Sequence, residues 1–172
     1  MRIIAGSFKG KKIFFPEDKK TRPLRDMVKE SIFNLIENSN KYDLQINKSN
    51  ILDLFSGSGS FGLECMSRGA KKVFFFENYP QTLKVLKKNI LDLKLSEKCK
   101  IFEKNCLNFY QYENITNEKF DITFISPAYK TNTHKNMIPL HTVKFIYLCH
   151  LTKSNKFANE IFNLLLVEDT HS

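Results

Sequence analysis

Short apolar runs alternate with segments of three- and four-residue apolar spacing along the middle of this chain. The apolar runs predict strands at 51–55, 72–77, 100–103 and 120–125. The last run is almost continuous, which is typical of a strand buried on both faces of a parallel sheet. The spaced segments predict amphipathic helices after Ser60 and from Pro80. Strands that alternate with helices predict a doubly wound, Rossmann-like α/β fold, in which ligands bind at the carboxyl ends of the strands.

The N-terminal part departs from this alternation. Residues 1–20 are rich in β-favouring side chains and predict a small β-hairpin that turns at Gly6 and Gly10. Apolar spacing from Pro23 predicts a helix, because proline suits the first helical turn. Residues 1–40 are therefore expected to form a hairpin-and-helix extension of the sheet.

The C-terminal part is less regular. The segment 143–149 predicts a strand, whereas 157–165 fits either a helix or the approach to a strand at 165–167. The completeness of the C-terminal strands is left open. The length of 172 residues favours one domain, 1–172, with a single core.

Composition predicts a soluble globular protein. Hydrophobic residues make up 42% of the chain and aromatic residues 13%, which is ample for a packed interior. No apolar run reaches the roughly 18 residues of a membrane span, and the start lacks the apolar stretch of a secretory signal. The four cysteines and four histidines have no metal-ligand spacing. We expect a cytoplasmic monomer with no bound metal and no membrane contact.

Positive charge gathers near the N-terminus. The chain carries a net charge of +9, and residues 1–30 hold nine basic residues against four acidic ones, which gives +5. Such a segment suits a polyanion, since each neutralised phosphate releases counterions. The alternative is a lysine-rich solvated face. The candidate phosphate-binding residues are Arg2, Lys9, Lys11, Lys12, Arg22 and Arg25.

A glycine-rich turn follows the first central strand. Gly57, Gly59 and Gly62 form a G-x-G-x-x-G pattern, and Glu77 follows the first glycine by 20 residues. This spacing fits a dinucleotide site, in which glycines allow close approach of the backbone and the carboxylate accepts ribose hydroxyls. Asp53 argues for a different ligand, because its charge would repel a pyrophosphate. S-adenosylmethionine, which carries an ammonium and a sulfonium, fits better.

The segment Ser126-Pro127-Ala128-Tyr129 follows the strand at 120–125. It resembles the D/N-P-P-Y/F loop of methyltransferases that act on exocyclic amino groups. In that loop, acceptor oxygens orient the amine and an aromatic ring stacks on the base. Ser126 replaces the acid or amide with a weaker, neutral acceptor. The alternative is an ordinary strand-ending turn.

Several groups of residues, taken together, carry a family resemblance. They are Met1-Arg2-Ile3-Ile4-Ala5-Gly6 with Gly10, Thr21-Arg22-Pro23 with Asp26, Val28-Lys29-Glu30 and Phe33-Asn34, and Leu52-Asp53-Leu54-Phe55-Ser56-Gly57-Ser58-Gly59 with Gly62-Leu63-Glu64. Over about residues 1–130 the chain resembles the RsmD family. Members of that family are S-adenosylmethionine-dependent methyltransferases that modify N2 of a guanine in small-subunit ribosomal RNA. The combination of these groups is more specific than any one of them.

The resemblance implies roles for individual residues. The cofactor-binding residues would be Asp53, Phe55, Gly57, Gly59, Glu77 and Asn105. Glu77 would hold the ribose, and Asn105 lies where the family usually has an aspartate near the adenine. Ser126, Pro127 and Tyr129 would form the catalytic loop. The implied partner is ribosomal RNA, either free or within a small-subunit particle.

Two departures from the family pattern keep another function open. The loop lacks its acid or amide. Residues 131–172 do not follow the family pattern of a further helix, a strand and a closing antiparallel hairpin, and too few residues remain for that hairpin. A noncatalytic cofactor- or RNA-binding remnant of the fold is the main alternative. An NAD-dependent oxidoreductase rests on the glycine pattern alone.

Overall fold

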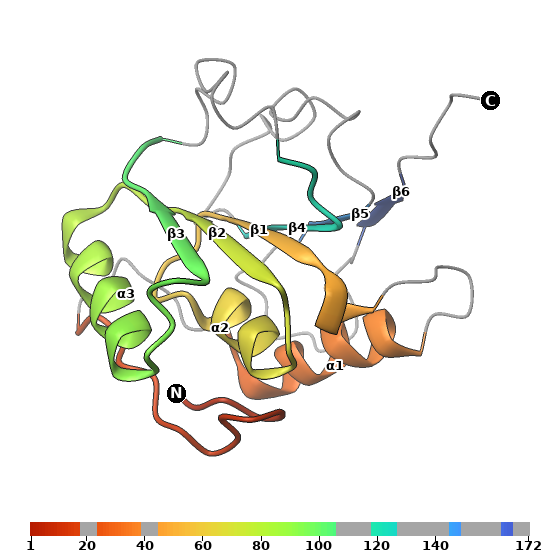
Figure 1. The fold of residues 1–172 in the computed structure, drawn as a ribbon, viewed down its shortest axis with the longest axis horizontal. Helices are drawn as coiled ribbons and strands as arrows, with labels where there is room; N and C mark the ends of the chain where they lie inside the picture. The colour runs from red at the N-terminus through yellow and green to blue at the C-terminus, as the bar shows by residue number, and fades with distance from the viewer. Residues whose placement is uncertain (18–23, 39–44, 106–117, 127–144, 149–162, 167–172) are drawn as a thin grey trace, which may run out of the picture.

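The computed structural model describes residues 1–17, 24–38, 45–105, 118–126, 145–148 and 163–166, and the account below concerns these residues (Figure 1). The helices are α1 (Asp26–Glu37), the 3₁₀ turn η1 (Ile46–Lys48), α2 (Ser60–Ser67) and α3 (Pro80–Asp92). The strands are β1 (Asn50–Leu54), β2 (Lys72–Phe76), β3 (Cys99–Phe102), β4 (Ile122–Ile125), β5 (Phe145–Leu148) and β6 (Asn163–Leu166).

The six strands form one sheet in the order β3-β2-β1-β4-β5-β6. The neighbours from β3 to β5 pair in parallel, whereas β6 runs antiparallel to β5. From β1 the sheet extends through β2 and β3 to one side and through β4, β5 and β6 to the other. The topological switch therefore lies between β1 and β4, where doubly wound folds bind their ligands.

The sequence predicted the central elements correctly. Each of the first four strands begins and ends within two residues of its expected bounds, and helices follow β1 and β2 as expected. The predicted α/β fold is confirmed. Near the C-terminus, β5 lies inside the predicted strand 143–149, and the ambiguous segment contains a strand, β6, at 163–166. That the whole chain forms one domain stays a prediction.

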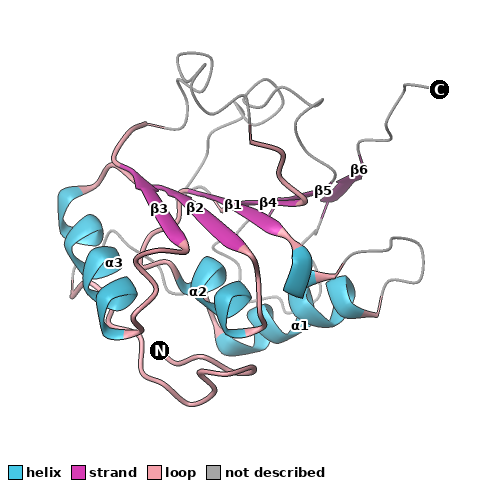
Figure 2. Ribbon diagram, viewed as in Figure 1, coloured by secondary structure: helices cyan, strands magenta, loops and turns pink. Residues whose placement is uncertain are grey.

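The described helices lie on one face of the sheet and bury a shared apolar core (Figure 2). Phe61 of α2 stacks on Phe33 of α1, with ring centroids 5.3 Å apart, and on Phe124 of β4, at 4.0 Å. One aromatic column thus connects the N-terminal helix with the sheet. Within the described ranges, no helix is long and apolar enough to cross a membrane.

Residues 1–17, here called the N-terminal segment, turn back on themselves as predicted. Arg2 and Lys12 form an antiparallel bridge, and Gly6 and Gly10 have φ values of +79° and +83°. A Cβ atom on Gly6 would lie 2.0 Å from the carbonyl oxygen of Ser67, so the segment docks on α2 at a distance that only glycine permits.

A buried carboxylate holds the N-terminal segment against the helices. Glu64 of α2 accepts hydrogen bonds from the backbone N–H groups of Ile4 and Ala5, both at 2.9 Å. Its oxygens also lie 3.7 Å from the ammonium of Lys29 and 3.3 Å from Arg68. Glu64 and Lys29 have fully buried side chains, and each charge compensates the other. The extension is thereby fixed to the sheet domain.

Candidate active site

Two carboxylates meet at the edge where the parallel strands end, here called the carboxyl edge. Asp53 lies one residue before the end of β1, and Glu77 directly follows β2. The two strands are hydrogen-bonded neighbours in which Leu54 pairs with Phe76. The register of the two strands therefore brings both predicted cofactor-binding carboxylates to the carboxyl edge.

A tight turn carries the chain from β1 into α2 above these carboxylates. Phe55, Gly57 and Gly59 all have positive φ values, of 56°, 58° and 80°. Phe55 is half-buried, and such a backbone costs a side-chain-bearing residue free energy, so the surrounding contacts must impose it. Gly62 in the first turn of α2 has no room for a Cβ atom, which would lie 2.3 Å from the ring of Phe75. The turn is thus pressed onto the sheet.

The Glu77 carboxylate holds the turn through hydrogen bonds to backbone N–H groups. One carboxylate oxygen accepts a 2.8 Å hydrogen bond from the N–H of Gly57, and the other accepts bonds of 2.9 Å from the N–H groups of Asn78 and Tyr79. A carboxylate has about four acceptor positions, so these three donors leave room for a ligand hydroxyl. Glu77 is therefore fixed in place and still able to bind a ribose.

Asp53 is buried without a compensating cation among the described residues. Its side chain is 1% exposed, and its one hydrogen bond within the described ranges comes from the N–H of Gly62, at 3.0 Å. The pKa of Asp53 is raised to about 8, chiefly by burial and in smaller part by the nearby charge of Glu77, against the opposing effect of the Gly62 hydrogen bond. A ligand cation beside Asp53 would stabilise the ionised form of this carboxyl group.

The other predicted cofactor and catalytic residues are placed in part. Ser126 is half-buried. It lies beside the end of β1, where its N–H donates to the carbonyl oxygen of Leu54 over 3.4 Å. Asn105 is exposed, three residues beyond β3. Pro127 and Tyr129 lie outside the described residues. The structure thus brings Ser126 to the same edge as Asp53, and their chemical roles stay predictions.

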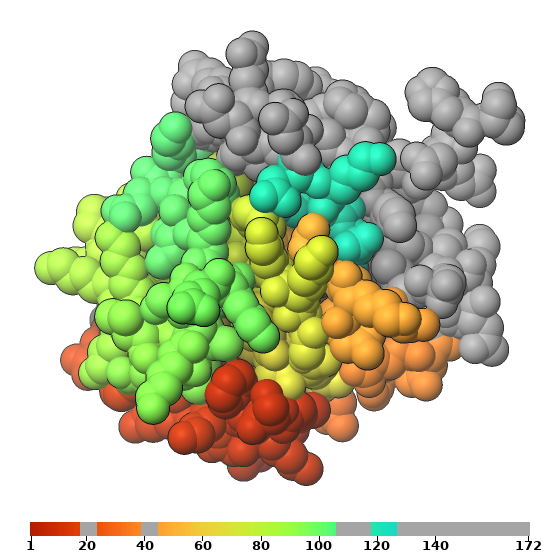
Figure 3. Space-filling view, viewed as in Figure 1, coloured from red at the N-terminus to blue at the C-terminus, as the bar shows by residue number. Residues whose placement is uncertain are grey.

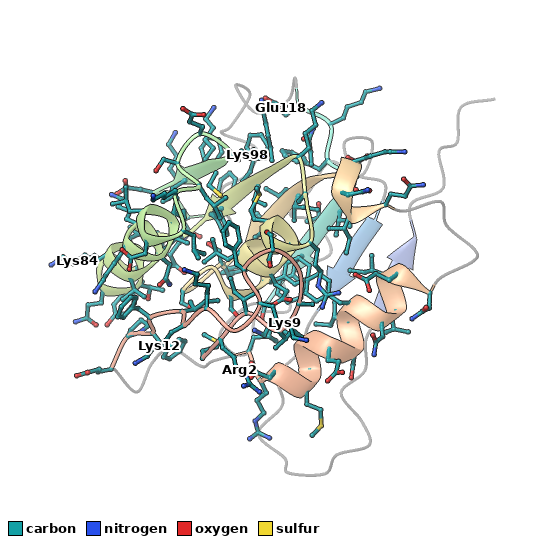
Figure 4. The ribbon with its side chains drawn as sticks, turned by 60° about the horizontal axis from the view of Figure 1, so that its bottom comes forward. Arg2, Lys9, Lys12, Lys84, Lys98 and Glu118 are labelled. Atoms are coloured by element: carbon teal, nitrogen blue, oxygen red, sulfur yellow. The ribbon has the colours of Figure 1, made fainter. Side chains whose placement is uncertain are left out.

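The predicted phosphate-binding residues surround the N-terminal segment. Figure 4 shows Arg2, Lys9 and Lys12 along one edge of the molecule. These three residues are exposed, as are Lys11 and Arg25, whereas Arg22 lies outside the described residues. Arg2 also lies 3.5 Å from the carboxylate of Asp26, an exposed contact that adds little stability.

The structure adds residues that the sequence reasoning did not single out. Lys88 of α3 places its ammonium 3.6 Å from the ring centre of Phe14, and so extends the basic surface of the N-terminal segment onto α3. Asn89, the next residue, is buried and hydrogen-bonds to both Phe14 and Ser58. Asn89 stands among the apolar positions of α3, and this polar residue on the buried face was the sequence signal that could have identified it. In the described ranges, no group of three or more His, Cys, Asp or Glu side chains could hold a metal ion.

Comparison of the sequence with known proteins shows the family to which this chain belongs. Residues 1–149 match the family described as conserved hypothetical protein 95, and the chain is 36% identical over 141 residues to ribosomal RNA small subunit methyltransferase D of Haemophilus influenzae. The chain belongs to the RsmD family. That alignment covers 81% of this chain and 69% of the relative. The family match extends past residue 130, where the recognisable motifs end.

Further relatives and solved structures are similar to this chain. A putative rRNA methyltransferase of Bacillus subtilis is 31% identical over 140 residues, covering 81% of this chain and 73% of that protein. A putative methylase of Haemophilus influenzae is 32% identical in the structural comparison, with a TM-score of 0.65 and coverage of 89% and 82%. A putative methyltransferase of Escherichia coli has a TM-score of 0.70 at 25% identity, with the same coverage.

The raised pKa of Asp53 predicts a stability that depends on pH. Between about pH 4 and pH 8 the folded protein keeps a proton on Asp53 that the unfolded chain releases, so the free energy of unfolding falls as pH rises. Asp53→Asn removes this titration. We expect the variant to gain stability relative to the unliganded wild type between pH 5 and pH 8, by roughly a few kcal/mol.

Denaturant unfolding of both proteins across this pH range measures the difference. Glu103→Gln, which neutralises an exposed carboxylate paired with Lys87 at the surface, is the matched control and should leave the pH profile nearly unchanged. A stability difference between Asp53→Asn and wild type that does not grow with pH would contradict the buried-charge interpretation.

Proposed function

We propose that this chain is an S-adenosylmethionine-dependent methyltransferase that modifies the exocyclic N2 amine of a guanine in small-subunit ribosomal RNA. The observation that carries the proposal of this cofactor is the buried carboxyl group of Asp53, which lies at the topological switch of the sheet and has no compensating cation among the described residues. The family and the names of its members support ribosomal RNA as the substrate, either free or in a small-subunit particle.

The described residues fit this cofactor. Asp53 would face its positively charged methionine part, the turn with Phe55, Gly57 and Gly59 would line that part, and Glu77 would accept the ribose hydroxyls. The N–H of Glu77 donates to the carbonyl of Phe102 over 3.2 Å, so β3 ends beside the same carboxylate. Asn105, just beyond β3, would contact the adenine. S-adenosylmethionine supplies an electrophilic methyl group on its sulfonium.

The loop that begins at Ser126 would bind the guanine. The lone pair of an aryl amine is delocalised into the ring, so an acceptor near the N–H groups must orient the nitrogen and stabilise its developing charge. The Ser126 hydroxyl and the Pro127 carbonyl would provide acceptors, and Tyr129 would stack on the base. Because a hydroxyl stabilises the developing positive charge less well than a carboxylate or a fixed amide oxygen, we expect slower transfer than with either of these.

The N-terminal segment would bind the RNA backbone. Lys9, Lys11 and Lys12 are exposed, and Lys88 of α3 lies beside the same segment. The noncatalytic alternative shares this surface and the cofactor site, and rests on the changed loop at Ser126 and on the divergent residues 131–172. The oxidoreductase alternative is disfavoured because the charge of Asp53 would oppose a pyrophosphate.

Cofactor binding tests the proposal first. Calorimetric titration should show binding of S-adenosylmethionine and no binding of NAD. Glu77→Ala should weaken the affinity by roughly 1–3 kcal/mol, because the variant has no charged acceptor for the ribose. Glu97→Ala, which removes an exposed carboxylate after α3, is the control and should bind normally. Binding of NAD without binding of S-adenosylmethionine would reject the assignment.

RNA binding should depend on the charge of the N-terminal segment. Replacing Lys9, Lys11 and Lys12 by Gln should flatten the plot of log affinity against log salt concentration, by roughly 0.7 for each phosphate that these lysines neutralise. Lys98→Gln is the control, because Figure 4 shows Lys98 on the opposite side of the molecule. Filter-binding assays over a salt series measure both slopes. If the triple variant and the wild type have equal slopes, these lysines belong to a solvated face and do not bind RNA phosphates.

The identity of residue 126 should set the rate of methyl transfer. Ser126→Asn supplies a stronger fixed acceptor and should raise the single-turnover rate by at most about 10²–10³-fold, while Ser126→Ala should lower it. Cofactor affinity, measured in parallel, should hardly change in either variant. If neither the wild type nor Ser126→Asn methylates small-subunit RNA although both bind cofactor, the noncatalytic function becomes the better one.

A further inference from the structure

Asn89 of α3 connects two parts of the molecule that the proposed function uses separately. Its side-chain oxygen accepts a 2.8 Å hydrogen bond from the N–H of Phe14, and its side-chain nitrogen donates to the carbonyl of Phe14 at 3.0 Å. The same nitrogen donates to the carbonyl of Ser58, also at 3.0 Å. One side chain therefore joins the N-terminal segment to the glycine turn.

The orientation of the amide is fixed by these partners. The N–H of Phe14 requires an acceptor, so the oxygen must face it, and both N–H bonds of the amide are then directed at the two carbonyls. Asn89 is 2% exposed, so water does not substitute for these partners. Removal of the donors would leave two carbonyl groups unsatisfied in a buried place.

Each end of this connection lies beside a proposed ligand. Ser58 stands between Gly57, whose N–H is held by Glu77, and Gly59, which packs so closely on α3 that a Cβ atom would lie 2.5 Å from Leu86. At the other end, Phe14 lies two residues after Lys12 and beneath the ammonium of Lys88. Figure 3 shows the N-terminal segment packed at one end of the molecule beside α3.

We propose that Asn89 is a positioning residue that couples RNA binding on the N-terminal segment to cofactor binding at the glycine turn. This inference rests on the proposed function. RNA bound to the segment restricts the remaining motion of Phe14 and, through Asn89, of the Ser58 carbonyl, so less conformational entropy is lost when the cofactor binds at the turn. By thermodynamic linkage, the cofactor tightens RNA binding by the same factor.

The coupling factor is measurable as a ratio of affinities. We expect S-adenosylhomocysteine, used to prevent turnover, to bind the wild type at least about fivefold more tightly when a small-subunit rRNA transcript is saturating. Asn89→Asp has the same shape but cannot donate to either carbonyl. The ratio for this variant, and for Asn89→Ala, should fall close to one. A purely structural role would weaken both affinities and leave the ratio unchanged.

Ser67→Ala is the matched control. The Ser67 hydroxyl accepts from the N–H of Phe8 at 3.0 Å and donates to the carbonyl of Ala5 at 2.5 Å, so it also anchors the N-terminal segment. It lies at the end of α2 remote from the glycine turn. This variant should loosen the segment and keep the wild-type coupling ratio.

Hydrogen exchange provides a test on the wild type that does not depend on variants folding. S-adenosylhomocysteine should slow exchange of the Phe14 amide severalfold, while the amide of Ser7, which donates to the Ser67 carbonyl, should change little. An unchanged Phe14 amide, or a ratio of one for a wild type that binds both ligands, would overturn the inference alone. A wild type that binds neither ligand would overturn the proposed function and this inference with it.

Discussion

The burial of the Asp53 carboxyl group at the end of β1 is the constraint on which the functional part of this structure depends. Asp53 and Glu64 both have almost fully buried carboxylates, and their surroundings differ. Glu64 is met by an ammonium, a guanidinium and two backbone N–H groups, whereas Asp53 receives, within the described residues, a single N–H from Gly62 and faces the charge of Glu77. Glu64 is thus a completed structural centre. Asp53 is an incomplete one, and a cation is what would complete it.

The contacts of Glu64 and its neighbours determine where the N-terminal segment lies relative to Asp53. Glu64 and Ser67 lie one turn apart on α2 and fix residues 4–8, while Asn89 on α3 fixes Phe14. These anchors place the basic segment along the helices, and Asn89 brings its Phe14 end close to the glycine turn. Under the proposed function, an RNA bound along the segment would extend past this end to bring a base to the carboxyl edge. A folded RNA spans such a length, whereas a single nucleotide does not.

The sequence revealed the features that depend on local pattern. Apolar runs located β1 to β4, and the 20-residue spacing from Gly57 to Glu77 placed the two at one edge because parallel neighbours share their carboxyl ends. The roles of Asn89, Lys29 and Glu64 were missed. Asn89 binds Phe14 from 75 residues away, Glu64 binds Ile4 from 60 and Lys29 binds Arg2 from 27, and such long-range partners leave no periodic signal. The segment 157–165 was ambiguous because apolar spacing alone does not distinguish an edge strand from a helix.

The balance between stability and binding favours an active cofactor site over a vestigial one. Asp53 destabilises the unliganded fold at neutral pH, and an asparagine of the same size would remove that cost. The hydrogen bond from Gly62 does not require the charge, because an asparagine oxygen accepts the same bond. Ser126, at the half-buried end of β4, carries no charge and so imposes no comparable cost. The costly residue is the one that is present, which supports the proposal that a cation binds beside Asp53.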